Sequence, residues 1–183
     1  IPAVDGMEIF FDKEETHRMC DDLGIPHVSW TRLAPSDTAE NLIARFGLPL
    51  VLKPRRSFWD DSGRAHETVD VIERLQHLSQ RLVEIPDRSR YLVESYFEGT
   101  GTGLSVLSRN GTILQAFQRI CSRTRHTGVC MFEFRVNHET GRFILIEINA
   151  RFWGSMPLPL ALGLDFPNRL HELLVRDQTY PEQ

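Results

Sequence analysis

The sequence has few cysteines and no long apolar run, and both absences narrow the class of protein. Its three cysteines, Cys20, Cys121 and Cys130, are odd in number and lack metal-site spacing, so we expect reduced thiols in a cytoplasmic protein. No segment reaches the roughly 20 apolar residues of a membrane span, and no basic-then-apolar leader opens the chain at Ile1. The net charge of −4 argues against a protein that coats nucleic acid.

Length and composition indicate a globular chain. With 183 residues, 41% of them hydrophobic and 25% charged, it can bury a core as one domain or as two small lobes. The sequence also lacks the spacing of a catalytic triad built on Cys, His or Ser, and its seven histidines are scattered. The chemistry must therefore be sought in other polar residues.

Helices are predicted from capping signals and apolar periodicity. Spacings typical of a capping box lie at 12–15, 37–40 and 70–73 and predict three helix starts. Gly24 and Gly47 are expected to end the first two of these helices. A further helical stretch is expected over 158–175, interrupted by Gly163 and Pro167.

Strands are predicted between these helices. Candidates lie at 27–33, 48–53 and 90–96. A hairpin is predicted from 104–107 and 113–117, joined near the turn signal Asn110-Gly111.

Two further strands, 128–136 and 142–151, carry polar side chains where apolar ones are expected. Alternate residues of a strand point to opposite faces of the sheet, which groups Glu147, Asn149 and Arg151 on one face. The other face of the second strand receives Ile144, Ile146, Ile148 and Ala150.

The pairing of these two strands determines which carboxylates meet. A three-residue loop, 139–141, would place His138 opposite Arg142, and the same register places Glu133 opposite Glu147. Carboxylates directly opposite each other lie roughly 4.5–5.5 Å apart at the backbone and repel, unless a cation or a proton lies between them.

A divalent cation is the simplest partner for Glu133, Glu147 and Asn149. Carboxylate and amide oxygens are hard ligands that suit Mg²⁺ or Mn²⁺, and Mg²⁺ keeps positions for water and substrate phosphates. The alternative is a solvent-facing strand with ordinary polar alternation. The low β-propensity of an asparagine in mid-strand disfavours that alternative.

Lys53 ends the predicted strand at 48–53, and a polar loop at 55–63 follows. A strand-end lysine offers a positive charge to phosphate oxygens, and the backbone amides of a loop can close over them. The alternative is a gatekeeper lysine that protects an edge strand. Taken alone, the motif favours the gatekeeper.

Glu94 lies near the end of an apolar strand that runs into a glycine-rich bend at 99–103. The dinucleotide-binding fingerprint requires a helix after the glycines, whereas here an apolar strand follows. We interpret the bend as a hinge whose backbone pairs with an adenine edge, while Glu94 accepts a hydrogen bond from the exocyclic amine. A loop tip with a surface glutamate is equally compatible with this segment alone.

Five short motifs follow one another along the chain. They are Asp12-Lys13, Val51-Leu-Lys53-Pro54, Val93-Glu94-Ser-Tyr-Phe-Glu-Gly99, Met131-Phe-Glu133-Phe134 and Leu145-Ile-Glu147-Ile-Asn149-Ala-Arg151. In this order they resemble the ATP-grasp superfamily, especially its carbamoyl-phosphate-synthetase-like and carboxylate–amine ligase members. The resemblance runs from about residue 10 to residue 170, and its most specific part is the Glu-Ile-Asn-x-Arg run.

The resemblance implies an α+β ATP-grasp fold with a mainly antiparallel core sheet, in which two α+β lobes hold ATP between them. It implies a small lid lobe at 27–93 and a core lobe with the metal-binding hairpin at 94–183. Residues 1–26 would form a linker and the first helix of the core lobe. The substrate-binding domain that precedes this region in relatives is expected to be absent.

The resemblance also implies contacts with ATP. Lys53 would bind the phosphates from the lid, and Lys13 would be a second phosphate contact. Glu94 would take the adenine amino group, with the backbone of Tyr96 and Phe97 on the edge of the ring.

For the metal and the reaction, the resemblance implies a second group of residues. Glu133, Glu147 and Asn149 would hold one or two Mg²⁺ ions that bridge the β- and γ-phosphates. Arg151 would stabilise charge on the transferred phosphoryl group or on an acyl phosphate.

The chain departs from the family pattern in three segments. The segment after Lys53 is bulky and has only Gly63, where many relatives have a glycine-rich phosphate loop. The stretch 100–103 lacks the acidic residue that commonly binds the ribose. Only 121–127 separates the strand expected at 116–120 from the metal strand, where relatives place a loop and a helix, so residues are expected to be missing there.

The implied function is that of an ATP-dependent ligase, in which ATP phosphorylates a carboxylate and an amine or similar nucleophile attacks the acyl phosphate. The two substrates are expected to meet near Arg151 and Trp153, although Trp153 is equally typical of a core aromatic. The implied cofactors are ATP and Mg²⁺ or Mn²⁺. The implied partners are small-molecule carboxylate and amine substrates, without nucleic acid or membrane, and a homodimer is the assembly to test.

Two other functions remain open on the sequence. The same carboxylate hairpin could serve a metal-dependent kinase or phosphohydrolase. The bulky loop after Lys53 and the short 121–127 stretch favour a nucleotide-binding module without turnover.

Overall fold

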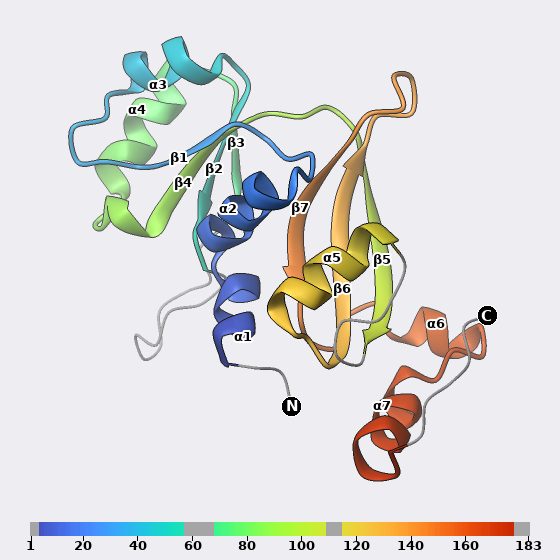
Figure 1. Ribbon diagram of the computed structural model, residues 1–183. Coiled ribbons are helices and arrows are strands. Elements are labelled where there is room, and N and C mark those ends of the chain that lie inside the picture. The colour runs from blue at the N-terminus through green and yellow to red at the C-terminus, as the bar shows by residue number, and fades with distance from the viewer. Residues whose placement is uncertain (1–3, 57–67, 109–114, 178–183) are drawn as a thin grey trace.

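A computed structural model of the protein describes residues 4–56, 68–108 and 115–177 and shows two β-sheets, each covered by helices (Figure 1). The strand pairs of both sheets are antiparallel, so the predicted α+β class with a mainly antiparallel core sheet is confirmed. Within these ranges, no helix is both long and apolar enough to cross a membrane.

The first unit, called the lid here, is a four-stranded sheet in the order β1-β4-β2-β3 with two helices on one face. Leu50, Leu52 and Val93 of the sheet pack with Leu42 and Leu78 of the helices in one buried cluster. The elements of the lid are β1 (Trp30–Arg32), α3 (Ala39–Phe46), β2 (Leu50–Pro54), β3 (Asp70–Ile72), α4 (Leu75–Glu84), a 3-10 turn (Arg88–Arg90) and β4 (Tyr91–Ser95).

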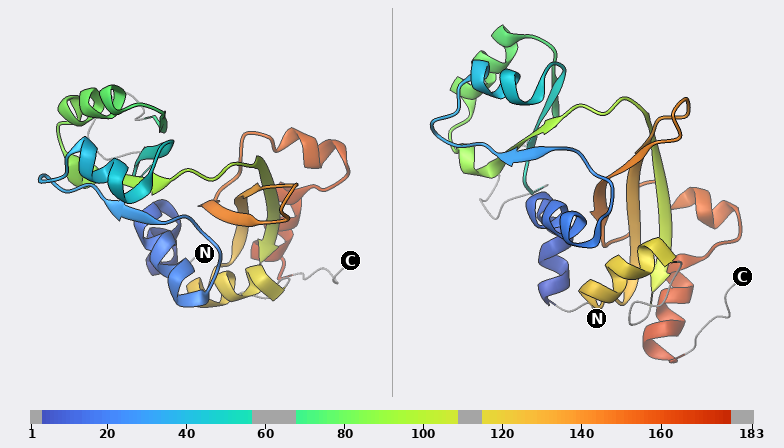
Figure 2. Two further views of the ribbon diagram at one scale, coloured as in Figure 1. Left: turned by 90° about the horizontal axis from the view of Figure 1, so that it is seen from above. Right: turned by 45° about the horizontal axis from the view of Figure 1, so that its top comes forward.

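The second unit, called the core unit, is a three-stranded sheet in the order β5-β6-β7. Phe132 and Ile148 of the sheet pack with Phe10, Met19 and Ile120 in a second buried cluster. Helices α1, α2 and α5 cover this face, and Figure 2 shows α6 on the other face. The elements are α1 (Val4–Phe11), α2 (Lys13–Leu23), β5 (Thr100–Ser108), α5 (Gln115–Thr124), β6 (Gly128–Val136), β7 (Phe143–Asn149), α6 (Pro157–Ala161) and α7 (Phe166–Val175).

Capping signals locate helices α2 and α3 well. Asp12 caps α2, and α3 is capped by Thr38, one residue after the predicted Asp37. Gly24 and Gly47 end these helices with φ values of 63° and 75°. Only glycine adopts such angles without a steric penalty, so the predicted helix ends are confirmed.

The helix start predicted at 70–73 is wrong. Residues 70–72 form the edge strand β3 of the lid, and α4 begins at Leu75. The Asp70 carboxylate accepts a hydrogen bond from Nε of Arg81 at 2.8 Å instead of capping a helix. Ile72 is fully buried, so burial against the sheet outweighs the local capping pattern.

The strand predicted at 113–117 is also wrong, because 115–117 begin α5. Ile120, Cys121 and Thr124 are buried with the spacing of one helix face. Residues 113–114 and the predicted Asn110-Gly111 turn lie outside the described residues. The strand expected at 116–120 is wrong as well, since these residues belong to α5, which ends at Thr124 and is followed by β6.

The hairpin of β6 and β7 pairs Glu133 with Glu147, as predicted, but its loop differs from the prediction. The amide of Asn137, rather than His138, lies opposite Arg142 and donates to its carbonyl oxygen at 2.8 Å. An irregularity after Glu133 absorbs the difference of one residue. As a result Leu145, and not the predicted Ile146, joins the buried cluster of the core unit.

Gly99 lies in the short linker between the two sheets and packs against the backbone of the hairpin. A methyl group at this position would lie 2.8 Å from the carbonyl oxygen of Val136 and 3.2 Å from the amide nitrogen of Asn137. Backbone atoms cannot rotate away, so we expect Gly99→Ala to lower the free energy of unfolding by about 1–3 kcal/mol. Urea unfolding measures this change.

Gly101→Ala is the matched control for this prediction. A methyl group at Gly101 has no neighbour within 4 Å, so this variant should stay close to the parent protein in stability. Equal stability of the two variants would show that the linker is not tightly packed.

Candidate functional site

Lys53 and Glu94 form a buried ion pair on the face of the lid sheet that is turned away from its own helices. Lys53 Nζ lies 2.6 Å from Glu94 Oε1, and the two residues are only 3% and 5% exposed. Burial would raise the pKa of Glu94, but the charge of Lys53 and the hydrogen bond with His17 hold it below its usual range. The predicted gatekeeper alternative for Lys53 therefore fails, because the side chain points into the protein.

His17 is a member of this cluster that sequence reasoning did not assign. Its Nε2 lies 2.5 Å from Glu94 Oε1, and its ring stacks on Trp30 with 5.3 Å between the ring centres. Its Nδ1 is buried without a hydrogen-bond partner among the described residues. Burial lowers the pKa of His17, so the ring is neutral at physiological pH. The one signal in the sequence is the spacing of four residues from Lys13, which places both on one face of α2.

Lys13 is the first residue of α2, and its side chain points toward Glu147 of the core sheet. Its Nζ lies 3.9 Å from Glu147 Oε2, and its backbone amide donates to the carbonyl oxygen of Arg55 at 2.9 Å. Burial lowers the pKa of Lys13, and the charge of Lys53 lowers it further. The carboxylates of Glu147 and Glu94 act in the opposite direction. The chain has only two lysines, and the structure brings both to this site.

The acidic pair lies on the outer face of the core sheet. Glu133 and Glu147 are cross-strand partners, and Nδ2 of Asn149 donates to Glu133 Oε1 at 2.7 Å. Burial and the neighbouring Glu147 charge raise the pKa of Glu133, although Arg151 and Lys13 act against this shift. The repulsion that remains between the two carboxylates is what a cation would relieve.

The donor set fits a divalent cation that is shared with a phosphate. In the described parts of the chain, no three His, Cys, Asp or Glu side chains group into a complete metal site. Two carboxylates and the amide oxygen of Asn149 nevertheless supply hard oxygen ligands, and Mg²⁺ normally takes the rest from water and phosphates. Glu133, Glu147 and Asn149 would hold the ion, and it would neutralise phosphate charge there.

The remaining predicted residues, Arg151, Tyr96 and Phe97, are at least partly exposed. Arg151 is exposed and donates a hydrogen bond to the carbonyl oxygen of Phe152 at 3.1 Å. Its positive charge acts to lower the pKa of Glu133. Tyr96 and Phe97 lie in the linker after β4, where Arg135 stacks over the Tyr96 ring and donates to the Phe97 carbonyl oxygen at 3.1 Å. The bulky loop after Lys53 lies mostly outside the described residues.

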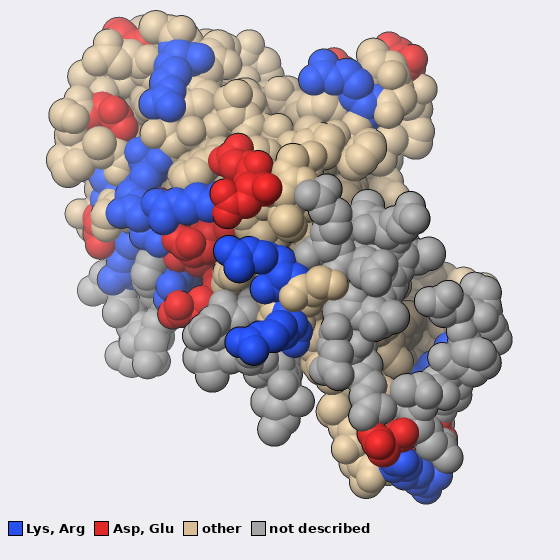
Figure 3. Space-filling model, in the orientation of Figure 1, with Lys and Arg blue, Asp and Glu red and all other residues tan. Residues whose placement is uncertain are grey.

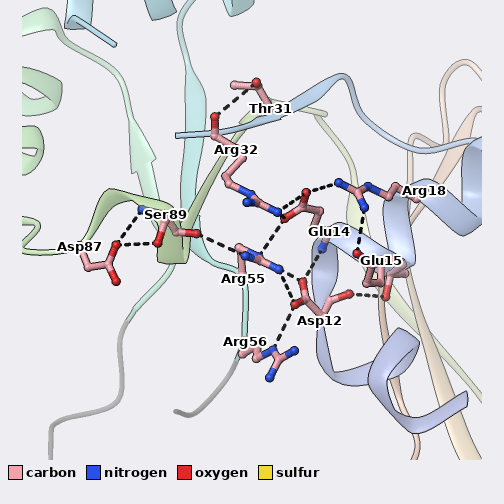
Figure 4. A network of polar contacts seen from close by, with 11 residues as sticks. Asp12, Glu14, Glu15, Arg18, Thr31, Arg32, Arg55, Arg56, Asp87 and Ser89 are labelled. Carbon is pink, nitrogen blue, oxygen red and sulfur yellow. Dashed lines mark hydrogen bonds and ion pairs between the residues drawn. The ribbon is translucent and has the colours of Figure 1, made fainter. Parts of the chain in front are cut away.

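A network of ion pairs, called the clamp here, joins the lid to α2 beside the site (Figure 4). Asp12 and Glu14 are only 1% and 2% exposed and receive arginines from the ends of β1 and β2. Arg55 binds Asp12 at 2.7 Å and Glu14 at 3.0 Å, and Arg32 binds Glu14 at 2.7 Å. Figure 3 shows Lys and Arg side chains beside Asp and Glu side chains on this face of the molecule. The clamp fixes the orientation of α2, which carries Lys13 and His17.

We expect Asp12→Asn to lower the free energy of unfolding by about 1–3 kcal/mol at pH 7, since asparagine keeps the helix cap but loses the ion pairs. Burial would raise the pKa of Asp12, but Arg55 and Arg56 hold it below its usual range. A depressed pKa adds stability above the unfolded value of about 3.9, and that stability is lost as pH falls through the folded value. The difference between parent and variant should therefore shrink below about pH 4 in urea unfolding.

Asp12→Ala separates the two roles of this residue. It removes the cap as well as the charge, so it should cost about 1 kcal/mol more than Asp12→Asn. A difference between parent and Asp12→Asn that does not change with pH would contradict an ion-pair role.

Both the sequence and the fold of the chain are similar to those of known proteins. Residues 103–166 match the family model described as "Carbamoyl-phosphate synthase L chain, ATP binding domain". A biotin carboxylase from Campylobacter jejuni superposes with a TM-score of 0.75 at 16% identity, over 100% of this chain and 49% of that chain. The chain has the ATP-grasp fold. The resemblance seen in the sequence is thereby confirmed at the level of the fold.

Two other solved structures share the ATP-grasp fold of this chain. The biotin carboxylase domain of Hydrogenobacter thermophilus 2-oxoglutarate carboxylase, in complex with ADP, its magnesium salt and bicarbonate, has a TM-score of 0.74 and 15% identity, over 100% of this chain and 49% of that chain. D-alanine-D-alanine ligase from Coxiella burnetii has a TM-score of 0.68 and 20% identity, over 96% of this chain and 60% of that chain. The chain thus spans about half the length of the two carboxylases. A comparison with curated protein sequences gives no match.

The family model matches only part of the candidate site. The matched residues include Glu133, Glu147, Asn149 and Arg151 but begin after both lysines. The grouping of Lys13, Lys53 and Glu94 with the acidic pair therefore comes from the structure of this chain itself.

Proposed function

We propose that the protein is an ATP-dependent ligase that activates a carboxylate as an acyl phosphate for attack by an amine or a similar nucleophile. The observation that carries this proposal is the convergence of three charged groups from three parts of the fold. Lys53 comes from the lid, Lys13 from α2, and Glu133 with Glu147 from the core hairpin. Such an arrangement suits a polyphosphate that is bound between cations.

In the proposed complex the two lysines bind the phosphates of ATP. Each lysine is now paired with a carboxylate, Lys13 with Glu147 and Lys53 with Glu94, so each exchanges part of that contact for a phosphate oxygen. Glu133, Glu147 and Asn149 would hold Mg²⁺ or Mn²⁺, which would neutralise part of the phosphate charge. Positioned charge of this kind accounts for most of the catalysis of phosphoryl transfer.

The adenine ring is proposed to lie along the linker that joins the sheets. Lys53 and His17 both contact Oε1 of Glu94, so Oε2 is available to accept a hydrogen bond from the adenine amino group. The backbone of Tyr96 and Phe97 would meet the ring edge. Because Arg135 already donates to the Phe97 carbonyl oxygen, the Phe97 amide is the better contact for the ring.

The reaction proceeds in two transfers. A carboxylate oxygen attacks the γ-phosphorus of ATP, the bond from that phosphorus to the bridging oxygen breaks, and ADP leaves. The amine nitrogen then attacks the acyl carbon, phosphate leaves with the electrons of the C–O bond, and the nitrogen loses a proton. Arg151 is proposed to stabilise the negative charge on the transferred phosphoryl group.

Trapping with hydroxylamine tests the acyl phosphate directly. The full-length protein is incubated with Mg·ATP, a panel of carboxylic acids and hydroxylamine, and both hydroxamate and ADP are measured. The proposal requires hydroxamate and ADP in equal amounts, with no ADP release when the acid is omitted. ADP release with water alone would support a phosphohydrolase, and Mg·ATP binding without any release would support a module without turnover.

A further inference from the structure

A pocket of about 410 Å³ opens on the same face of the core sheet as the acidic pair. Its floor is formed by Gly103 and Ser105 of β5 and Met131 of β6. These three residues point away from the buried cluster, because their strand neighbours Leu104, Val106 and Phe132 belong to it or pack against it. A volume of this size falls within the range of small-molecule sites, about 300–1,000 Å³.

The wall of the pocket is apolar. Trp153 is only 5% exposed and packs edge-on against Phe166, with 5.4 Å between the ring centres. Leucines of α6 and of the turn after it complete the wall, and among the described lining residues none is charged. The polar groups of the lining side chains are the hydroxyls of Ser105 and Ser155 and the indole N–H of Trp153.

The pocket begins directly beside the proposed reaction site. Gly103 is the cross-strand partner of Glu133, and Met131 is the partner of Asn149. Partners of this kind lie roughly 4.5–5.5 Å apart at the backbone. Trp153 follows Arg151 by two residues, so the wall starts where the charged cluster ends. A molecule whose carboxylate lies near Arg151 can extend the rest of its structure into this pocket.

We propose that the acid substrate carries an apolar side chain, of leucine to phenylalanine size, which fills this pocket. The inference rests on the proposed ligase function, because that function places a carboxylate at Arg151. Absence of charge from the lining disfavours acids with a second charged group, since an ionised group in this pocket would be left unpaired. The small residues Gly103 and Ser105 leave the floor open, and a larger side chain at either position would occupy the space.

The test compares acids and variants in the hydroxylamine assay with the full-length protein. With Mg·ATP, kcat/KM for 3-phenylpropanoate and 4-methylpentanoate should exceed that for acetate by at least about a hundredfold, as expected for several buried carbons. Gly103→Val adds a side chain whose first carbon lies 3.4 Å from the sulfur of Met131 and fills the floor. It should lower the preference for the larger acids by about tenfold or more.

Gly101→Val is the matched control, because Gly101 lies two residues earlier on the same face of β5, outside the pocket, with open space around it. It should retain the preference of the parent protein. Equal rates for acetate and the larger acids, faster turnover of succinate than of 3-phenylpropanoate, or equal effects of the two valine variants would overturn the inference while leaving ligase activity intact.

A binding measurement decides the inference if no acid is turned over. Calorimetric titration of 3-phenylpropanoate into protein saturated with Mg²⁺ and a non-hydrolysable ATP analogue should show binding that Gly103→Val weakens by about tenfold and Gly101→Val does not. Absence of binding, or competition between the acid and the nucleotide analogue for one site, would overturn it. Failure of hydroxamate formation with normal acid binding would count against the proposed function and not against the pocket.

Discussion

Replacement of Lys53 by methionine is expected to abolish Mg·ATP binding and to lower the free energy of unfolding by about 3–5 kcal/mol at pH 8. The variant removes the partner of a carboxylate that is only 5% exposed, and the cost of an unpaired buried charge is large. The substitution does not alter the linker between β4 and β5 or the hairpin of β6 and β7. Urea unfolding and calorimetric titration with Mg·ATP measure the two effects separately.

The destabilisation should depend on pH through His17. The positive charge of Lys53 contributes to the lowered pKa of His17, after the larger effect of burial. Removal of that charge raises the folded pKa of His17, and a protonated His17 can then pair with Glu94 at 2.5 Å. A group with a raised folded pKa adds stability that is present at low pH and lost as pH rises, so Lys53→Met should be less destabilised at pH 5.5 than at pH 8.

The double variant Lys53→Met/Glu94→Gln separates stability from function. With both charges removed, most of the stability should return, because replacing a buried ion pair by uncharged groups is often close to neutral. Nucleotide binding should not return. A double variant as unstable as the sum of the single variants would show that the two residues do not act as a pair.

Arg81→Met provides a control for the loss of an ion pair elsewhere in the lid. Arg81 binds Asp70 at 2.8 Å, but both side chains are 22% exposed. A pair in contact with water contributes about 0–1 kcal/mol, so this variant should be nearly as stable as the parent and should bind Mg·ATP normally.

The acidic pair could be predicted from the sequence because its geometry is local. Strand alternation has a period of two, and one short loop determines the register, so Glu133 and Glu147 could be paired without knowledge of the rest of the fold. The predicted loop was wrong by one residue, but the irregularity after Glu133 restores the predicted pairing of Glu133 with Glu147.

The role of His17 could not be predicted in this way. Its partner Glu94 is 77 residues away, and its position on α2 gives no sign of which sheet it will meet. The same limit applies to Asp12, which was recognised as a helix cap while its arginine partners were not. Contacts between lid and core depend on how the two units pack, and no local pattern carries that information.

The two wrong elements have a related cause. Residues 70–73 have a good capping pattern, yet 70–72 form β3 because Ile72 is buried against α4 and the sheet. Residues 115–117 are compatible with a strand by composition, and their helical state is set by the burial of one face of α5. Short segments with mixed signals take the structure that buries their apolar side chains.

Glu147→Gln is expected to lower the rate of Mg·ATP turnover by more than about a hundredfold. Glutamine keeps the shape of the side chain but removes the negative charge that attracts the cation. The remaining ligands, Glu133 and Asn149, hold one negative charge between them, so the affinity for Mg²⁺ and for Mg·ATP should fall as well. Steady-state ADP release at several Mg²⁺ concentrations measures both changes.

The stability of the metal-free protein distinguishes a ligand from a structural residue. Glu147 acts on the fold in two opposite ways, since it repels Glu133 and pairs with Lys13 at 3.9 Å. The raised pKa of Glu133 means that its ionisation costs stability as pH rises through the folded value, and loss of the Glu147 charge relieves part of that cost. Loss of the partly exposed pair with Lys13 costs about 0–1 kcal/mol, so the net change at pH 7 without metal should stay within about 1 kcal/mol. Glu139→Gln, at the exposed tip of the same hairpin, is the control and should change neither turnover nor stability. A large loss of stability in metal-free Glu147→Gln would mean that the carboxylate is needed for folding, and the catalytic effect could then not be assigned to a cation.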